Sequence, residues 1–242
     1  MRVEAAVEVK GLGKRFGDFA ALEDVSFRVH EGEVFGLIGP NGAGKTTTLR
    51  ILATLLLPTS GYARVLGCDV VSEADKVRPL ISYLAEEAGT YRNLTGYEYL
   101  SIVARVYFKS SADAEEAVEE AVKVSGLGDR VRDKMKTYSK GMKRRIQVAR
   151  ALMTRPKLAI LDEPTAGLDI FHAQHVRETV KEHVAEGSSV VLSSHNMLEV
   201  EYLCSKLAFI HRGRIVVEGE PQSIKDRYGA SNLEEAFLEV IR

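Results

Sequence analysis

This sequence has few cysteines and a net charge close to zero. Its 242 residues include two cysteines, Cys68 and Cys204, which are too few for a disulfide framework and match no metal-binding spacing. We therefore expect a reducing, cytosolic setting. The formal net charge of −1 gives the molecule as a whole no attraction to nucleic acid or to an anionic membrane.

Long apolar runs are missing as well. The most apolar stretch, ILATLLLP, is far shorter than the roughly 18 residues that a membrane span needs. Glu4 and Glu8 stand where a secretory signal needs an apolar centre. We expect a chain that neither spans a membrane nor is exported by this route. The apolar content of 45% is ordinary for a globular protein with one buried core.

The chain alternates between strand-like and helix-like segments. Strand patterns recur at VEVKGLG, FAALEDVSFRVHEGE, VFGLIG, residues 61–71, residues 81–84, LAILDEP, SVVLSSH and LAFIHRGRIVVEGE, and a helix is expected near residues 171–186. Between residues 88 and 155 the pattern is helical, and Asp113 is expected to cap a helix whose apolar stripe includes Ala117 and Ala121. This alternation predicts an α/β core with a mainly parallel sheet and one inserted helical lobe.

The segment GPNGAGKTTT lies between a predicted strand and a predicted helix. Its spacing, G-x-x-x-x-G-K-[ST], is typical of a phosphate-binding loop in this context. The glycines let backbone N–H groups close around phosphates, Lys45 supplies charge to the β and γ phosphates, and Thr46 offers a hydroxyl to Mg²⁺. The nucleotide-binding residues expected here are Gly39, Pro40, Asn41, Gly42, Ala43, Gly44, Lys45, Thr46 and Thr47.

Two carboxylates follow the apolar run of LAILDEP. Asp162 stands at the predicted carboxyl end of a strand, where ligand sites of open α/β sheets lie, and it is expected to hold Mg²⁺. Glu163 is expected to orient or deprotonate the water that attacks the γ phosphate. Alone, the pair would read as an acidic turn facing solvent, but beside the Lys45 loop the catalytic interpretation is favoured.

A third motif, YSKGMKRRIQVARAL, begins at Tyr138. Ser139 is a favourable N-cap, and Met142, Ile146 and Ala149 mark the buried stripe of the helix behind it. The free N–H groups and partial positive charge of such a helix start can bind an anion.

The order of these motifs is that of a known family. With AGLD and the histidine of VVLSSH following in turn, nearly the whole chain resembles the nucleotide-binding ATPase subunit of an ATP-binding cassette (ABC) transporter. The resemblance implies a RecA-like P-loop NTPase core with an N-terminal antiparallel β subdomain, and ATP and Mg²⁺ as cofactors. It implies one ATPase domain with a core of residues 1–87 and 156–220, a helical subdomain of residues 88–155 and a helical tail of residues 221–242.

The resemblance also implies a site shared by two ATPase subunits. Ser139 and Gly141 of one subunit would close over the γ phosphate held by the other, and Asp169 would communicate across this head-to-tail dimer. His195 would contact the γ phosphate and Glu163 as part of the catalytic group. Phe16 would stack on adenine, with ordinary packing of that ring as an equally open alternative.

Four residues depart from the family pattern. Tyr138, Lys140 and Met142 replace the usual leucine, glycine and glutamine, and Glu86 replaces the glutamine of the loop that joins the core to the helical lobe. A carboxylate at position 86 can still ligate Mg²⁺ through water, although it adds negative charge beside phosphate. We expect Glu86 to sense the metal and relay closure to residues 89–95. For Lys140, a cation near the trapped phosphate and a solvent-facing side chain both stay open.

Other features have simpler interpretations. His172 and His175 lie one helical turn apart but lack a third ligand, so a solvated face is expected in place of a metal site. The basic cluster of residues 134–145 could suggest nucleic acid, but the chain has no overall basic balance, so the cluster is interpreted mostly as an exposed helix face with some attraction for phosphate. The tail is expected to form an amphipathic helix that docks on its own domain, with a dimer contact as the alternative; its apolar positions are Leu233, Phe237, Leu238 and Ile241.

The resemblance makes transport the expected function. A chain without a membrane segment must pass its motion to another polypeptide, which we expect to be a separate transmembrane permease contacted through the helical lobe. GAGKTTTLRIL, SKGMKRR and LEEAFLEV resemble the branch that drives export of drugs, sodium or similar cargo. The ATPase is expected to pair with itself or a related subunit, to bind no nucleic acid, and to work at the inner face of the cell membrane. The alternatives are a soluble cassette ATPase that acts on ribosomes or nucleic acid, and a small-molecule P-loop kinase.

Overall fold

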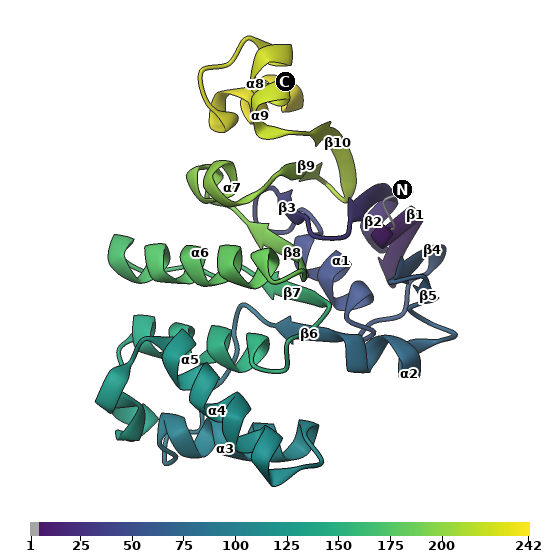
Figure 1. The fold of residues 1–242 in the computed structure, drawn as a ribbon. Helices are drawn as coiled ribbons and strands as arrows, with labels where there is room; N and C mark the ends of the chain where they lie inside the picture. The colour runs from purple at the N-terminus through teal and green to yellow at the C-terminus, as the bar shows by residue number, and fades with distance from the viewer. Residues whose placement is uncertain (1–4) are drawn as a thin grey trace.

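The computed structural model describes residues 5–242, so the prediction for Glu4 lies outside the described residues. Two sheets and a lobe of helices make up the molecule (Figure 1). The strands are β1 (Ala5–Phe16), β2 (Phe19–His30), β3 (Val34–Ile38), β4 (Ser60–Val65), β5 (Cys68–Asp69), β6 (Ile81–Leu84), β7 (Leu158–Asp162), β8 (Ser189–Ser194), β9 (Lys206–His211) and β10 (Arg214–Gly219). The helices are α1 (Lys45–Leu52), α2 (Ala74–Val77), α3 (Gly96–Tyr107), α4 (Ser111–Ser125), α5 (Lys140–Leu152), α6 (Ile170–Ala185), α7 (Met197–Leu203), α8 (Pro221–Tyr228) and α9 (Leu233–Ile241), with short 3₁₀ turns at Arg78–Leu80, Gly128–Arg132 and Met135–Thr137.

The larger sheet has the strand order β10-β9-β3-β8-β7-β6. All neighbouring pairs in it are parallel except β9 with β10. The smaller sheet, β2-β1-β4-β5, is antiparallel throughout. The predicted fold class, a mainly parallel core with an antiparallel β subdomain and an inserted helical subdomain, is therefore confirmed.

Apolar residues on both faces of the larger sheet explain its place at the centre of the molecule. Every residue of β3, β7 and β8 is buried, as expected for parallel strands covered by other elements on both sides. One apolar core fills the space around α1 between the two sheets, and a second lies under α5, α6, α7 and α9. The sheet is thus a rigid support for the loops that leave the carboxyl ends of its strands.

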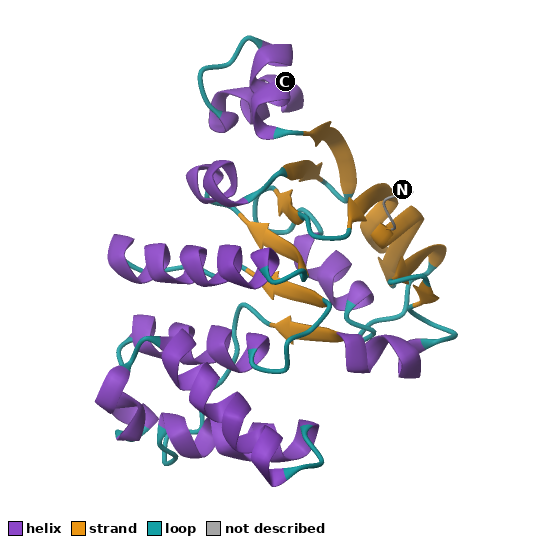
Figure 2. Cartoon of the chain, in the orientation of Figure 1, coloured by secondary structure: helices purple, strands orange, loops and turns teal. Residues whose placement is uncertain are grey.

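The helical lobe has a core of its own. Residues 88–155 are drawn as helices and loops (Figure 2), and α3, α4 and α5 bury Leu100, Ala121 and Met135 between them. The cap predicted at Asp113 is wrong: α4 begins earlier, and the side chain of Ser110 accepts the N–H of Asp113 instead. Ser and Asp are comparable caps, so the composition of this segment left its first turn ambiguous.

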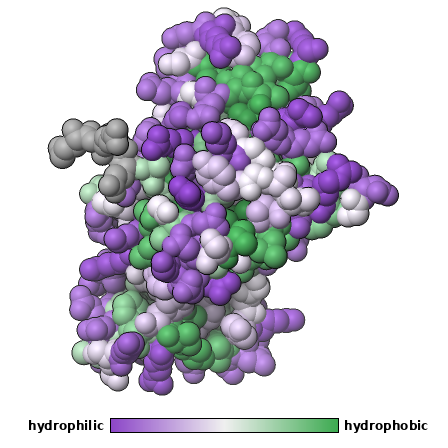
Figure 3. Space-filling model, turned by 90° about the vertical axis from the view of Figure 1, so that its right-hand side faces the viewer, coloured by the Kyte–Doolittle hydropathy of each residue, from purple (hydrophilic) through white to green (hydrophobic). Residues whose placement is uncertain are grey.

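The C-terminal helices pack on the core as predicted, but only through part of the expected face. Leu233 and Phe237 are buried, and the ring of Phe237 meets the ring of Phe209 at 5.1 Å between centroids. Leu238 and Ile241 remain 48% and 37% exposed. Figure 3 shows apolar surface near the end of the molecule that the C-terminal helices form. Among the described residues, no helix is both long enough and apolar enough to span a bilayer.

Candidate nucleotide-binding and catalytic site

The phosphate loop connects β3 to α1 at the carboxyl end of the larger sheet. Helix α1 begins after Gly44, which has a φ of 112° and gives the helix no side-chain cap, so its first N–H groups are available to an anion. Gly39 cannot carry a side chain, because a Cβ there would lie 2.1 Å from the carbonyl oxygen of Ile210. The sequence of the loop is therefore matched to its conformation and to the adjacent strand β9.

Lys45 lies inside the loop and is only 6% exposed. Its Nζ donates to the carbonyl of Gly39 at 2.7 Å and to that of Pro40 at 3.3 Å. It also lies 3.4 Å from Oε1 of Glu163. The cation is thus held by two backbone dipoles and one carboxylate, all of which come from the site itself.

Glu163 joins the phosphate loop to the loop after β8. It is 3% exposed, and its Oε2 lies 2.8 Å from Nδ1 of His195 and 3.3 Å from the His195 backbone nitrogen, which donates to it. The structure therefore brings three of the predicted residues together: Glu163 forms an ion pair with Lys45 and a hydrogen bond with His195.

Asp162 lies at the end of β7, two strands away from the phosphate loop in the sheet order. It is 1% exposed, and its Oδ1 accepts a hydrogen bond from Ser193 Oγ at 2.5 Å. The Tyr83 hydroxyl is 3.5 Å from Oδ2, and burial and the Asp162 charge raise the pKa of Tyr83, so that hydroxyl stays protonated. Asp162 is thus a buried acceptor held in place at the end of β7, directly before Glu163.

The donor set fits Mg²⁺ better than a metal that needs a closed protein cage. Residues 5–242 contain no group of three or more His, Cys, Asp or Glu side chains placed to hold a metal. Mg²⁺ in phosphate-transfer sites takes one or two protein oxygens and completes its shell with water and phosphate. Asp162 and the hydroxyl of Thr46 suit that mode.

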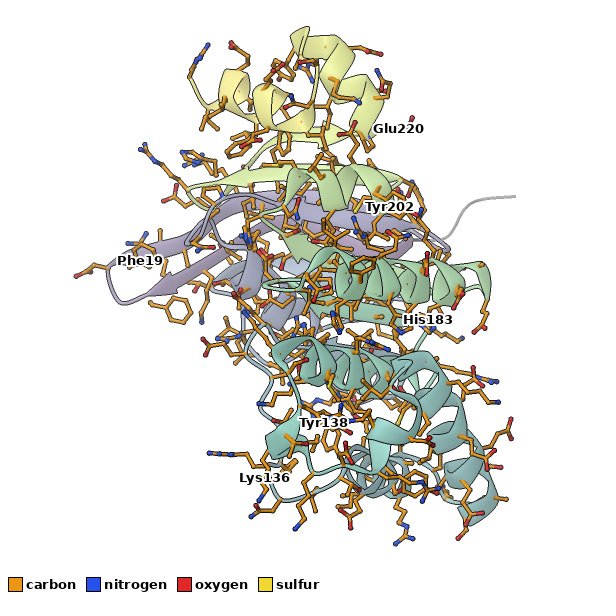
Figure 4. The ribbon with its side chains drawn as sticks, turned by 90° about the vertical axis from the view of Figure 1, so that its left-hand side faces the viewer. Phe19, Lys136, Tyr138, His183, Tyr202 and Glu220 are labelled. Carbon is orange, nitrogen blue, oxygen red and sulfur yellow. The ribbon has the colours of Figure 1, made fainter. Side chains whose placement is uncertain are left out.

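A cleft of about 290 Å³ opens over the loop. Its lining residues are Phe16, Phe19, Ala21, Pro40, Asn41, Gly42, Ala43, Gly44, Lys45, Thr46, Thr47, Glu86 and Glu163. Phe16 and Phe19 pair across the turn between β1 and β2 and are 49% and 64% exposed, and Figure 4 shows Phe19 at the tip of that hairpin. Phe19 was not among the predicted site residues, although an aromatic residue three positions after Phe16, with Gly17 and Asp18 between them, was a usable signal.

Ser139, Gly141 and Asp169 form a separate group that does not line this cleft. Ser139 caps α5 by accepting the N–H of Met142 at 3.2 Å, as predicted. Asp169 caps α6 and lies 2.6 Å from Nδ1 of His172, and these hydrogen bonds to His172 lower the Asp169 pKa. The His172 ring covers Gly141, where a Cβ would come within 2.8 Å of Cδ2. His172 therefore links the start of α5 to the start of α6.

The departures from the family pattern have structural counterparts. Tyr138 is buried and donates its hydroxyl hydrogen to the carbonyl of Arg130 at 2.9 Å. Glycine at position 96 leaves room for this hydroxyl, because a Cβ on Gly96 would lie 2.5 Å from the Tyr138 hydroxyl oxygen. The Lys140 side chain lies over Gly167 of the AGLD loop, since a Cβ on Gly167 would meet its Cε at 2.8 Å. In this chain Lys140 therefore contacts the loop that precedes Asp169.

Two of the simpler interpretations need correction. His175 does not face solvent, because its Nε2 lies 2.7 Å from the carbonyl of Val124 and its ring is partly buried. The basic cluster of residues 134–145 is not a uniformly exposed face either. Arg144 is 6% exposed, and burial lowers its pKa while neighbouring carboxylates oppose that shift.

A glycine-rich loop after a buried parallel strand, with Asp162 and Glu163 at the end of another strand of the same sheet, defines a P-loop ATPase. Comparison with known proteins identifies the family. Residues 22–166 match the family described as ABC transporter, and the chain belongs to that family. Its nucleotide is ATP, and its activity is ATP hydrolysis.

Three similar proteins illustrate the relationship. The linearmycin resistance ATP-binding protein LnrL of Bacillus subtilis (strain 168) is 36% identical over 244 residues, which covers 98% of this chain and 78% of that protein. The daunorubicin/doxorubicin resistance ATP-binding protein DrrA of Streptomyces peucetius is 41% identical over 229 residues, with coverages of 94% and 69%. A solved structure of the ATP-binding subunit of an ABC transporter superimposes with a TM-score of 0.88 at 31% identity, covering 98% of this chain and 100% of that one.

Proposed function

We propose that the chain powers the export of small organic molecules through a separate membrane permease, by binding and hydrolysing ATP between two ATPase subunits. The observation that carries the proposal is the separation of two groups within one chain. Ser139, Gly141 and Asp169 lie apart from the cleft that holds Lys45. A complete site then requires a second subunit, as in the arrangement that the motif order implies.

In the proposed site, each residue acts on one part of the nucleotide. The phosphates lie along residues 39–47, with Lys45 beside the β and γ phosphates and the uncapped start of α1 adding its positive end. Phe16 and Phe19 offer two aromatic faces for the adenine ring. Gly39 to Thr47 would in this way fix the position at which the γ phosphate is cut.

The carboxylates have different tasks. Thr46 and Asp162, with Glu86 through water, would hold Mg²⁺, which neutralises phosphate charge when bound. Glu163 would orient the attacking water and take its proton, and its hydrogen bond to His195 keeps the carboxylate directed along the cleft.

The second subunit would supply the remaining contacts. The N–H groups at the start of α5, capped by Ser139, would meet the γ phosphate held by the facing Lys45 loop. Asp169 would lie at the interface between the two subunits. Because ATP would contact both subunits in the closed state alone, its binding would favour closure and its hydrolysis would remove that bias.

The proposed partners and cargo are supported by the names of the relatives. LnrL and DrrA are named for resistance to linearmycin and to daunorubicin and doxorubicin, and the cargo proposed here is of that kind. The permease would contact the helical subdomain, proposed as residues 88–155, and the Glu86 loop, which places the ATPase at the inner face of the membrane. A role on ribosomes or nucleic acid has no counterpart in these relatives and is not proposed.

Complementation between two inactive variants tests the shared site. Lys45→Ala removes the cation from one half-site, and Ser139→Arg blocks the other, so each variant alone is expected to lose ATPase activity. An equal mixture forms half its dimers from unlike chains, each with one intact site, and is expected to recover about a quarter of wild-type activity if sites act independently.

The control for this experiment is Ser110→Arg, because Ser110 caps α4 as Ser139 caps α5. Loss of either cap is expected to lower the free energy of unfolding by about 1 kcal/mol, but the α4 variant is expected to keep its ATPase activity. A mixture that stays inactive while both variants are folded, or a Ser139→Arg variant that is fully active alone, contradicts the shared site.

A further inference from the structure

Arg144 is a buried cation whose hydrogen-bonding capacity is fully used. Its Nε donates to the carbonyl of Pro164 at 3.0 Å, and Nη1 donates to Ala85 at 2.9 Å and Glu86 at 3.2 Å. Nη2 donates to the carbonyls of Asp162 at 2.6 Å and Glu163 at 2.8 Å. A guanidinium has five N–H donors, and here each one meets a backbone carbonyl.

These five acceptors come from two separate turns. Ala85 and Glu86 follow β6, and residues 162–164 form the end of β7 and the turn after it. Arg144 itself belongs to α5, the helix that Ser139 caps. One side chain of the helical lobe therefore fixes both the loop that carries Glu86 and the backbone that carries Glu163.

The backbone at Glu163 needs such a restraint. Glu163 has a φ of 51°, in the left-handed region that costs a non-glycine residue about 1–3 kcal/mol and persists where the surroundings hold it. Its N–H donates to Ser193 Oγ at 3.0 Å, and its carbonyl is held by Arg144. With both backbone groups fixed, the side chain is directed toward Lys45 and His195.

We infer that Arg144 is a positioning residue, through which the seating of α5 on the core sets the alignment of Glu163 and the conformation of the Glu86 loop. It does not contact the nucleotide cleft. A shift of α5 would strain five hydrogen bonds at once, so the position of the helical lobe and the readiness of the water-activating carboxylate are linked. The inference rests on the proposed role of Glu163.

The number of N–H donors on the side chain at position 144 predicts how strongly each substitution lowers kcat. Lysine keeps the charge but has three donors on one nitrogen, and glutamine has two, so neither can serve both turns fully. Arg144→Gln is expected to lower kcat by at least about tenfold, since misplacing a reacting group by roughly 1 Å can cost a hundredfold. KM for ATP is expected to stay within about twofold, because the phosphate loop is untouched. Arg144→Lys is expected to fall between wild type and Arg144→Gln.

Arg145→Gln is the matched control. The neighbouring Arg145 is also partly buried, but its Nε donates to the carbonyl of Ser125 inside the helical lobe, at 2.7 Å. Its replacement is expected to lower the thermal midpoint without the loss of kcat. Measuring kcat, KM and the midpoint for all three variants separates positioning from general stability.

The outcomes are distinct. A folded Arg144→Gln variant with wild-type kcat overturns the inference, as does an equal fall in kcat for Arg145→Gln at the same thermal midpoint. If Arg144→Gln does not fold, the inference is tested with Arg144→Lys, and a wild-type kcat in that variant overturns it. Glu163→Gln is assayed in parallel, because retained activity there would contradict the proposed function, whereas an inactive Glu163→Gln beside a fully active Arg144→Gln contradicts this inference alone.

Discussion

A methyl group at Gly39 is expected to displace the phosphate loop. In the Gly39→Ala variant, the new Cβ would lie 2.1 Å from the carbonyl oxygen of Ile210 and 3.2 Å from the Cβ of Ala43. The first of these is roughly 1 Å or more inside ordinary van der Waals contact. Ile210 belongs to β9, which is held between β3 and β10 in the larger sheet, so the loop is expected to move and not the strand.

This displacement of the loop is expected to lower both the stability of the protein and its ATPase activity. Overpacking of this kind lowers the free energy of unfolding by about 1–3 kcal/mol, which urea denaturation measures. A loop displaced by roughly 1 Å no longer presents its N–H groups to the phosphates together, and we expect ATPase kcat/KM to fall by about 100-fold. Titration with a fluorescent ATP analogue is expected to show weaker binding as the cause.

Gly229→Ala is the control for the loss of a glycine alone. Gly229 ends α8 with a φ of 60° and has no neighbour within 4 Å of an added Cβ. Alanine there is expected to cost about 1 kcal/mol from backbone conformation and to leave ATP binding intact. A Gly39→Ala variant with wild-type affinity for ATP and an unchanged urea midpoint would refute the steric argument.

Two further predictions concern a buried carboxyl and the aromatic pair. Glu199 is 2% exposed and burial raises its pKa above 4.5, so the folded state binds the proton more tightly and this group's stabilisation is lost as pH rises through the folded pKa. Glu199→Gln is therefore expected to gain stability relative to wild type as the pH rises above 4.5. A difference in the free energy of urea unfolding between the two proteins that does not change with pH would contradict this prediction. For the aromatic pair, we expect each single variant, Phe16→Ser or Phe19→Ser, to raise KM for ATP by about tenfold or less, since a stacked ring contributes about 0.5–1.5 kcal/mol. An unchanged KM in both variants would show that neither ring holds adenine.

The sequence was sufficient for the features that depend on local periodicity. The buried run before Gly39 and the apolar residues at 158–161 predicted parallel strands, because a strand covered on both faces has few polar residues. The phosphate loop was equally readable, since its glycine spacing reflects backbone geometry within a few residues. The roles of the individual site residues stay predictions until they are assayed.

The features that sequence analysis missed depend on contacts between distant segments. Arg144 reads as one more cation in a basic cluster, and its burial follows only from carbonyls 18 to 59 residues away. His175 is likewise occupied by the carbonyl of Val124, 51 residues earlier. For the tail, the apolar stripe predicted the helix correctly, but periodicity cannot tell which apolar residues will meet the core and which, like Leu238, stay exposed.

The shared ATP site is tested most directly by the mass of a variant that binds ATP without cutting it. Glu163→Gln keeps the size and hydrogen-bonding shape of the side chain but removes the base, so ATP and Mg²⁺ are expected to hold two 26.7 kDa chains together as a stable dimer in light-scattering measurements. The double variant Lys45→Ala, Glu163→Gln is expected to remain monomeric under the same conditions. A Glu163→Gln chain that binds ATP and stays monomeric at saturating nucleotide would contradict the account.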